Sequence, residues 1–459
     1  MIKTSLKPLA WALLGSLALS TPARADLTEE LRAELQSQRA RLEQLEKKLA
    51  EATAAAQQAQ ASARESAAAA TQVATQAAAQ PAKATAAGGM PAGLSIYGIA
   101  DAGVEYANYG QGAKTRVQSG LGSASRLGFK GERSFGDDLK AYFQLEAGVS
   151  IDNGQNTGHS SNISNPGQGA ASSSAPNTTG VAIFSRNTFV GLKGRYGDIR
   201  FGRDYAPIYL LASASDPFTI GGATAFRLWS SAAASRFDNG VFYTSPSFSG
   251  WQAALAYSAG MENNSRSEVG VTGASTSIGP KDEGKGESAS LSYRQGPLYA
   301  AVGYLSFLRQ GTVTTPATEN IRRRSRNLAA TYDLPWGKLY AQYLLGEDNQ
   351  EGVGKKLDRR VWWLGASVPL KDRHTLRAVY GHLDDRMSTD RDSTHYGLGY
   401  EYALDKQTDL YAYYAQVSNQ NGGKNSLCAG GSCQGYDGDT NLPANFTPKS
   451  LMMGARYRF

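Results

Sequence analysis

The stretch SRLGFKGERSFGDDLKAYFQLEAG, residues 125–148, is the most informative part of the chain. Its halves read as two strands of about ten residues, and Gly136-Asp137-Asp138 between them supplies the residues that a tight hairpin turn needs. Charged and apolar side chains alternate along the first strand, so Arg126, Lys130 and Glu132 share one face. A soluble sandwich buries its apolar face, whereas a barrel in lipid turns that face outward and keeps charges in a wet lumen. The rest of the sequence is needed to distinguish between these two folds.

The composition favours one large barrel over several soluble domains. Of the 459 residues, 41% are hydrophobic, and the chain contains 51 Gly, 24 Tyr and 14 Phe. After the N-terminus no apolar run approaches the roughly 20 residues of a membrane helix. A helical membrane protein is therefore excluded, whereas a β-barrel is not, because each of its strands gives only a weak hydropathy signal.

Residues 1–25 have the pattern of a signal peptide. A basic start precedes an apolar stretch from Leu9 to Leu19, and Ala23-Arg24-Ala25 forms an A-x-A cleavage site. We therefore expect export across the inner membrane. Removing the three basic residues of this segment lowers the formal net charge from +7 to +4. That excess is too small to indicate a nucleic-acid partner.

The chain has two cysteines, Cys428 and Cys433, close together in SLCAGGSCQG. In an exported protein this spacing predicts a short loop closed by a disulfide. A metal site is the weaker alternative, because it would need more ligands nearby.

Residues 26–80 are predicted to form a coiled coil. Leucines at 31, 35, 42, 45 and 49 fall on alternating a and d positions of a heptad, and alanines continue this register. The helix would be about 80 Å long at about 1.5 Å per residue. Gln38 occupies a d position, where it is expected to set register or oligomeric state. A lone helix is the alternative, and residues 81–93 read as a linker.

From Leu94 to Phe459 the chain contains about sixteen strand candidates. Short connections alternate with long polar ones, as in antiparallel hairpins whose turns lie at one rim of a barrel and whose loops lie at the other. The long connections are Asp152 to Gly180, Pro207 to Ala234, Met261 to Gly286, Gln310 to Arg322, Asp348 to Leu357 and Asn419 to Pro448.

Strand polarity agrees with a lipid-facing barrel. In the last strand Leu451, Met453 and Tyr457 alternate with Arg456 and Arg458. An arginine that faces the bilayer midplane costs about 2–4 kcal/mol, so both arginines are expected to face water in the lumen.

Aromatic residues near strand ends, including Trp336 and the pair Trp362-Trp363, suit interfacial girdles. The fourth strand is an exception. In the phase expected for it, Asn187 faces lipid and Val190 and Leu192 face the lumen.

Leu94 to Phe459 resembles the general diffusion porins of Gram-negative outer membranes, especially those of beta-proteobacteria. The motifs behind this resemblance are SIYGIADAGVEY at Ser95, the stretch at Ser125, FSRNTFVGLKGRYGDIRFGRDYAP at Phe184, YTSPSFSGW at Tyr243 and the terminal GARYRF. The resemblance implies an all-β transmembrane barrel of sixteen antiparallel strands that forms homotrimers. It also implies a third long loop folded into the lumen as a constriction. The N-terminal coiled coil departs from the family pattern.

In such porins, wall arginines form a ladder that faces acidic residues of the inward loop. Carried over residue by residue, Arg126, Arg186 and Arg236 match the ladder, and Arg203 of GRDY is a fourth candidate. The inward loop would be Pro207 to Ala234, whose one acid is Asp216 and in which Arg227 adds a positive charge.

These identities predict a water-filled outer-membrane channel for small hydrophilic solutes, with a preference for anions such as carboxylates or phosphate. The alternative for the arginines is simple pairing with lumen carboxylates. No cofactor is expected. Besides itself and these solutes, the expected partners are outer-membrane lipid and lipopolysaccharide, through Arg322-Arg323-Arg324, and peptidoglycan, through the periplasmic coil. The alternatives for the three arginines are attraction of anionic solutes and a solvated loop patch.

Two other function classes remain. An enzyme is the first, but no G-x-S-x-G, H-E-x-x-H or phosphate-cradling glycine loop occurs, and the four histidines read as loop or interfacial residues. The second is a structural tether, in which the coil reaches into the periplasm and the barrel anchors it.

Overall fold

The computed structural model describes residues 93–136, 138–154, 156, 183–260, 285–308, 321–427 and 442–459, together with single helical positions between 36 and 50. The chain divides into two units, Met1–Gly88 and Gly89–Phe459. The expected signal peptide, most of the linker, Asp137 of the hairpin turn and both cysteines lie outside the described residues. The signal peptide and the disulfide therefore stay predictions.

The described positions of the first unit are helical and exposed, among them Gln38, Glu43 and Lys47. This agrees with a helix in residues 26–80. The leucines of the expected seam lie outside the described residues, so pairing of this helix into a coiled coil stays a prediction.

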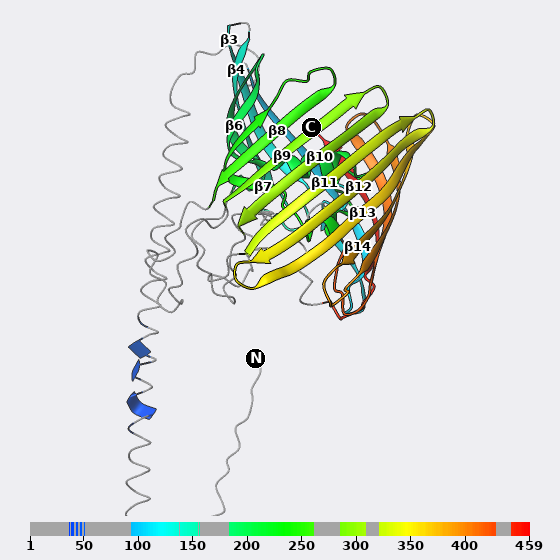
Figure 1. Ribbon diagram of the computed structural model, residues 1–459. Coiled ribbons are helices and arrows are strands. Elements are labelled where there is room, and N and C mark those ends of the chain that lie inside the picture. Colours follow the sequence, from blue (N-terminus) through cyan, green and yellow to red (C-terminus); the bar gives the residue numbers. More distant parts are fainter. Residues whose placement is uncertain are drawn as a thin grey trace, which may run out of the picture. The chain divides into compact units, whose positions relative to one another are not determined.

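The second unit is a barrel of antiparallel strands (Figure 1). The strands in chain order are β1 (Leu94–Asn108), β2 (Ala113–Ser119), β3 (Arg126–Phe135), β4 (Leu139–Gly148), β5 (Thr188–Gly194), β6 (Gly197–Tyr205), β7 (Arg236–Thr244), β8 (Trp251–Ala259), β9 (Lys285–Gln295), β10 (Leu298–Leu308), β11 (Ile321–Leu334), β12 (Gly337–Gln350), β13 (Gly354–Leu370), β14 (His374–Asp385), β15 (Ser393–Ala403), β16 (Thr408–Asn419) and β17 (Lys449–Arg458). Two short helices, α2 (Pro207–Ala214) and α3 (Phe226–Ser230), lie between β6 and β7.

The sheet closes because β17 pairs with β1, from Ile99 opposite Arg458 to Asn108 opposite Lys449. β2 pairs with residues 102–108 of β1, and β3 pairs with residues 94–99 of the same strand. The two strands together therefore fill one position in the wall, and the seventeen strands make a barrel of sixteen positions. The fold class expected from the sequence is confirmed, although β2 itself was not predicted.

Side chains alternate between the outside and the lumen as expected. On β17 Leu451, Met453 and Tyr457 are exposed, whereas Met452 and Arg456 are buried. Gly136 has a φ of +70°, which a hairpin turn between β3 and β4 requires. Among the described residues, no helix has the length and apolar character needed to cross a membrane.

The expected phase of the fourth strand is wrong. Val190 and Leu192 are 59% and 43% exposed, and they pair with outward-facing Phe143 and Ala141 of β4, whereas Asn187 is buried. The strand starts only at Thr188, so the alternation has to be counted from there rather than from residue 181. With this correction β5 follows the same rule as its neighbours.

The expected long loop from Asp348 to Leu357 is also wrong. β12 continues to Gln350 and β13 begins at Gly354, so only residues 351–353 connect them. Asp348 forms a two-pronged ion pair with Arg323 of β11, at 2.6 and 2.8 Å. This ion pair compensates the charge of Asp348 inside the barrel wall. The polar residues around it can therefore continue β12 as a strand, although their sequence resembles a loop.

Candidate pore constriction

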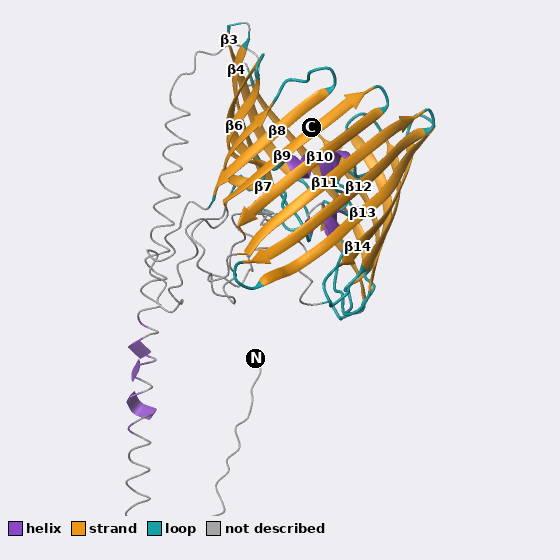
Figure 2. Ribbon diagram, in the orientation of Figure 1, coloured by secondary structure: helices purple, strands orange, loops and turns teal. Residues whose placement is uncertain are grey.

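The segment between β6 and β7 fills part of the barrel interior. α2 starts with Pro207, which suits the first turn of a helix, and it packs against β8 to β11, while α3 packs against β13 and β14. Figure 2 shows both helices inside the ring of strands. The expected inward loop is therefore found in the structure, whereas its helices were not predicted.

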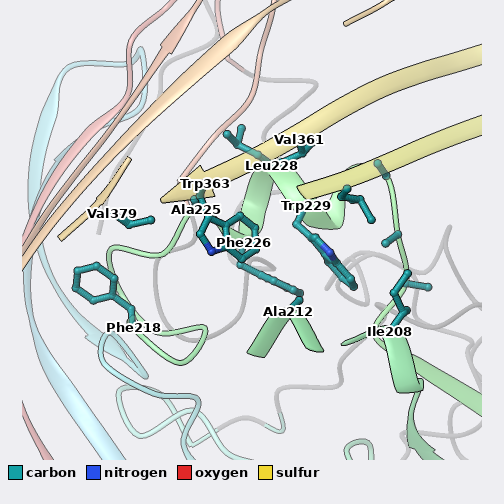
Figure 3. Packing of buried hydrophobic residues seen from close by; sticks show 14 of the residues in the cluster. Ile208, Ala212, Phe218, Ala225, Phe226, Leu228, Trp229, Val361, Trp363 and Val379 are labelled. Atoms are coloured by element: carbon teal, nitrogen blue, oxygen red, sulfur yellow. The ribbon is translucent and has the colours of Figure 1, made fainter. Parts of the chain in front are cut away.

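Apolar side chains attach this loop to the wall. In Figure 3 Phe226, Leu228 and Trp229 of α3 lie beside Val361 and Trp363 of β13, and all five are buried. Such packing excludes water and gives the loop one position across the lumen. Trp363 was expected in an interfacial girdle. It faces the lumen instead, because its neighbour Trp362 occupies the outward position of β13.

Hydrogen bonds fix the loop backbone to the opposite side of the barrel. Trp363 Nε1 donates to the Ser215 carbonyl at 2.8 Å, and Ser325 Oγ donates to the Ala232 carbonyl at 2.6 Å. His395 was read as a loop or interfacial residue, but it is buried in the lumen, and its Nε2 lies 2.9 Å from the Ala223 carbonyl. These bonds satisfy carbonyls that would otherwise be buried without a partner.

Two arginines of the expected ladder meet at the base of the loop. Arg186 Nε donates to Glu146 Oε1 at 2.5 Å, and Arg186 Nη2 donates to the hydroxyl of Tyr205 at 2.9 Å. Arg236 donates to the same hydroxyl, and its guanidinium lies 4.0 Å from the Tyr205 ring centroid. Tyr209 of α2 stacks on Tyr205 at 4.4 Å, so the loop itself covers the group.

Arg126 of β3 completes what we call the arginine cluster, Arg126, Arg186 and Arg236. Its Nε donates to the Ala124 carbonyl and its Nη2 to Ser123 Oγ, both at 3.0 Å. It interacts electrostatically with Glu146 and Arg186. Whereas Arg186 and Arg236 are buried, Arg126 is only half-buried. Glu146 is the carboxylate that pairs with this cluster, whereas Asp204, which also interacts electrostatically with Arg236, forms an ion pair with Arg200 at 3.2 Å.

Arg203 does not join the cluster. A register shift between Gly202 and Asp204 interrupts the pairing of β6 with β7 at this point. The Arg203 side chain donates to the carbonyls of Ser185 at 2.8 Å and Arg186 at 3.0 Å, and it forms an ion pair with Asp238. Its charge is therefore largely compensated.

Asp216 does not face the arginine cluster either. Its carboxylate accepts hydrogen bonds from Ile220 N at 2.6 Å, Thr224 Oγ1 at 2.7 Å and Phe218 N at 3.3 Å, all within the loop. Burial raises the pKa of Asp216 to about 6, against the lowering effect of these bonds and of Arg377. Asp216 therefore stabilises the fold of the loop itself. Arg227, the other charged residue of the loop, lies half-buried on α3.

Paired charged residues line the far wall of the lumen, which β14 to β17 form, and of their arginines the sequence analysis missed Arg377 but expected Arg456 in the lumen. Arg377 of β14 donates to the Pro217 carbonyl of the loop and to Glu401 Oε2 at 2.9 Å. Arg456 of β17 pairs with Asp409 at 2.8 Å. Strand phase alone puts these side chains in the lumen, but their pairing follows from the strand register. The far wall is close to charge balance, unlike the arginine cluster.

Replacing Arg186 with alanine is expected to destabilise the barrel by about 3–5 kcal/mol, because Glu146 would stay buried without its ion-pair partner. The side chains of Arg186 and Glu146 are only 4% and 5% exposed. Urea unfolding of the refolded protein in lipid vesicles measures the change. A matched double replacement, Arg186→Leu with Glu146→Leu, should recover most of the loss. Equal stability of R186A and the unchanged protein would contradict a structural role of this pair.

A family model described as Gram-negative porin matches residues 66–422. The chain belongs to the Gram-negative porin family. Outer membrane porin protein 32 of Delftia acidovorans is 26% identical to this porin over 386 residues, which make up 82% of this chain and 97% of that protein. An outer membrane porin of Bordetella pertussis is 26% identical over 368 residues, 71% of this chain and 89% of that protein.

Solved structures share the barrel. An anion-selective porin from Comamonas acidovorans matches 80% of this porin and 99% of its own chain, with a TM-score of 0.62 and 24% sequence identity. The trimer form of OmpT of Vibrio cholerae matches 80% of this porin and 99% of its own chain, with a TM-score of 0.55 and 17% identity. The porin is therefore an outer-membrane β-barrel for passive diffusion, and its relatives are channels rather than enzymes.

Proposed function

We propose that this porin passes small hydrophilic solutes with a preference for anions. The arginine cluster carries the proposal. Its three positive charges and the one negative charge of Glu146 leave a net charge of +2 at the base of the inward loop. The paired far wall adds little net charge to oppose it.

The physical reason is field focusing. A water-filled lumen between walls of low dielectric constant concentrates the field of fixed charges, which raises the local concentration of counter-charged solutes. Burial of Arg186 and Arg236 does not remove this effect, since the field of an uncompensated charge extends beyond its contact distance. One structural relative is an anion-selective porin, which supports the same preference.

Swelling of liposomes that contain the refolded porin tests the proposal. Small organic anions and cations of matched size are compared with an uncharged sugar. We expect all three to enter, with the anion fastest. Entry of the cation faster than the anion would contradict the anion preference, and no entry of any solute would contradict the channel itself.

Anion preference should also rise as the pH falls from 7 to 5. Asp216 has a raised pKa of about 6, so it is mostly ionised at pH 7 and mostly neutral at pH 5. Loss of one negative charge from the loop should raise the anion-to-cation permeability ratio about twofold. The raised pKa also means that protonation of Asp216 stabilises the folded loop fully below its ordinary pKa of 3.8, and that this contribution is lost as the pH rises from there to about 6.

The matched control is Asp216→Asn. At both pH values its anion-to-cation permeability ratio should equal the higher value that the unchanged porin shows at pH 5. A pH effect of the same size in D216N would assign the titration to another group.

We infer that the functional unit is a homotrimer in the outer membrane, as in the trimer form of the Vibrio cholerae relative. The N-terminal segment suggests a second role. Residues 26–65 precede the part that matches the family model, and their described positions are helical and exposed. This favours a periplasmic spacer that contacts peptidoglycan.

Deletion of residues 26–80 separates the two roles. We expect unchanged single-channel conductance together with loss of co-sedimentation with isolated peptidoglycan. Full retention of peptidoglycan binding would contradict the spacer role.

A further inference from the structure

An apolar groove of about 730 Å³ crosses the outward face of strands β8 to β13. Its floor is built from small side chains, Ala300, Ala330 and Ala341, and large aromatic side chains such as Trp251 and Trp362 line it as well. Its volume falls within the roughly 300–1,000 Å³ of ligand pockets. Since the outward face of the barrel contacts the hydrocarbon of the membrane, this groove suits a lipid acyl chain.

A basic patch lies at the long-loop end of the same face. Every second residue of β11 faces outward, and in this phase Arg322, Arg324 and Arg326 precede Leu328, which lines the groove. Arg326 is two residues from Leu328, about 7 Å along the strand. On β13, Arg360 is likewise two residues from Trp362 of the groove.

The strand register brings the two arginines to one level. Arg326 is opposite Leu345 of β12, and Leu345 is opposite Arg360 of β13. β11 and β13 are two strand spacings apart, about 10 Å. Two long side chains can reach one group between them across this distance.

The charge of the patch is only partly compensated. Arg360 has Asp384 at 3.5 Å, and Glu347, which is opposite Arg324, has Lys355 at 3.6 Å. Within the part of the chain that the structure describes, neither Arg324 nor Arg326 has a carboxylate within 4.0 Å. Arginines at a membrane surface without such partners attract anionic lipid headgroups.

We propose that this face binds one phosphorylated lipid of the outer leaflet, with an acyl chain in the groove and a phosphate held between Arg326 and Arg360. Both chain ends of the barrel lie at the short-turn rim, so the long-loop end faces the outer leaflet, where lipopolysaccharide carries acyl chains and phosphates together. A second copy of the chain fits less well, because its docking would bury Arg324 and Arg326 without carboxylates.

Native mass spectrometry of the delipidated full-length protein tests the site. The probes are lipid A with both phosphates and the same lipid with its phosphates removed. We expect binding of the phosphorylated probe at least about tenfold tighter, and loss of that advantage in the double variant R326Q with R360Q. Equal binding of the two probes, or equal binding by the variant, would overturn the proposal.

Two controls keep the result specific. R195Q with R373Q removes the same charge at the short-turn rim and should leave binding unchanged. Ala330→Trp fills the groove and should weaken both probes, whereas Ala378→Trp, on the outward face of β14 beyond the groove, should weaken neither. Dissociation of the oligomer by A330W without loss of lipid binding would assign the groove to a subunit contact and overturn the proposal. The urea midpoint of each variant confirms that it is folded.

Discussion

Replacing Arg126 and Arg236 with glutamine is expected to lower the anion-to-cation permeability ratio about three- to tenfold. The two replacements take the arginine cluster from a net charge of +2 to zero, since Arg186 and Glu146 then compensate each other. A unit charge about 10 Å from an ion in water contributes about 0.4 kcal/mol before salt screening, with opposite signs for anions and cations. Reversal potentials at two salt concentrations measure the ratio, and the effect should shrink at higher salt.

The matched control is the double variant R195Q with R373Q, which removes two charges at the short turns. It should leave the ratio close to that of the unchanged porin, because these exposed rim charges are screened by solvent. If both double variants lowered the ratio equally, overall charge rather than the cluster would set selectivity.

Replacing Gly397 with valine is expected to displace the inward loop. A Cβ at Gly397 of β15 would lie 2.0 Å from the Ala223 carbonyl oxygen of the loop, a backbone atom that cannot rotate away. Overpacking of this kind costs about 1–3 kcal/mol. Loop amides in residues 207–234 should therefore exchange hydrogen roughly tenfold faster or more, and the single-channel conductance should rise and fluctuate.

Leu398→Val provides the control, because Leu398 is 58% exposed and its outward side chain cannot reach the loop. It should leave both exchange and conductance unchanged. If the loop amides of G397V exchanged hydrogen at the same rate as those of the unchanged protein, the close packing of the loop against Gly397 would be contradicted.

The barrel was predictable from the sequence because it depends on a local pattern. Alternation along β17 and the turn at Gly136 need no knowledge of distant residues. The errors arose where a strand end was misjudged. Val190 was assigned to the wrong face because β5 starts at Thr188, and polar residues near Asp348 were read as a loop because their partner Arg323 lies on another strand.

The site was predictable only in part, because it depends on strand register. The sequence motifs located Arg126, Arg186 and Arg236, which the fold brings together. They did not reveal that Tyr205 and Glu146 would bind two of these arginines, or that Arg203 would form an ion pair with Asp238 outside the cluster. These pairings depend on the register of β4 to β7, which determines which charged side chains lie next to each other.

The reversal potential of the unchanged porin in a planar bilayer, under a tenfold gradient of potassium chloride, tests the central claim most directly. A charge-lined lumen with a net positive cluster predicts a potential whose sign reports faster passage of chloride than of potassium. A potential of the opposite sign would show cation selectivity and would contradict the assigned role of the arginine cluster.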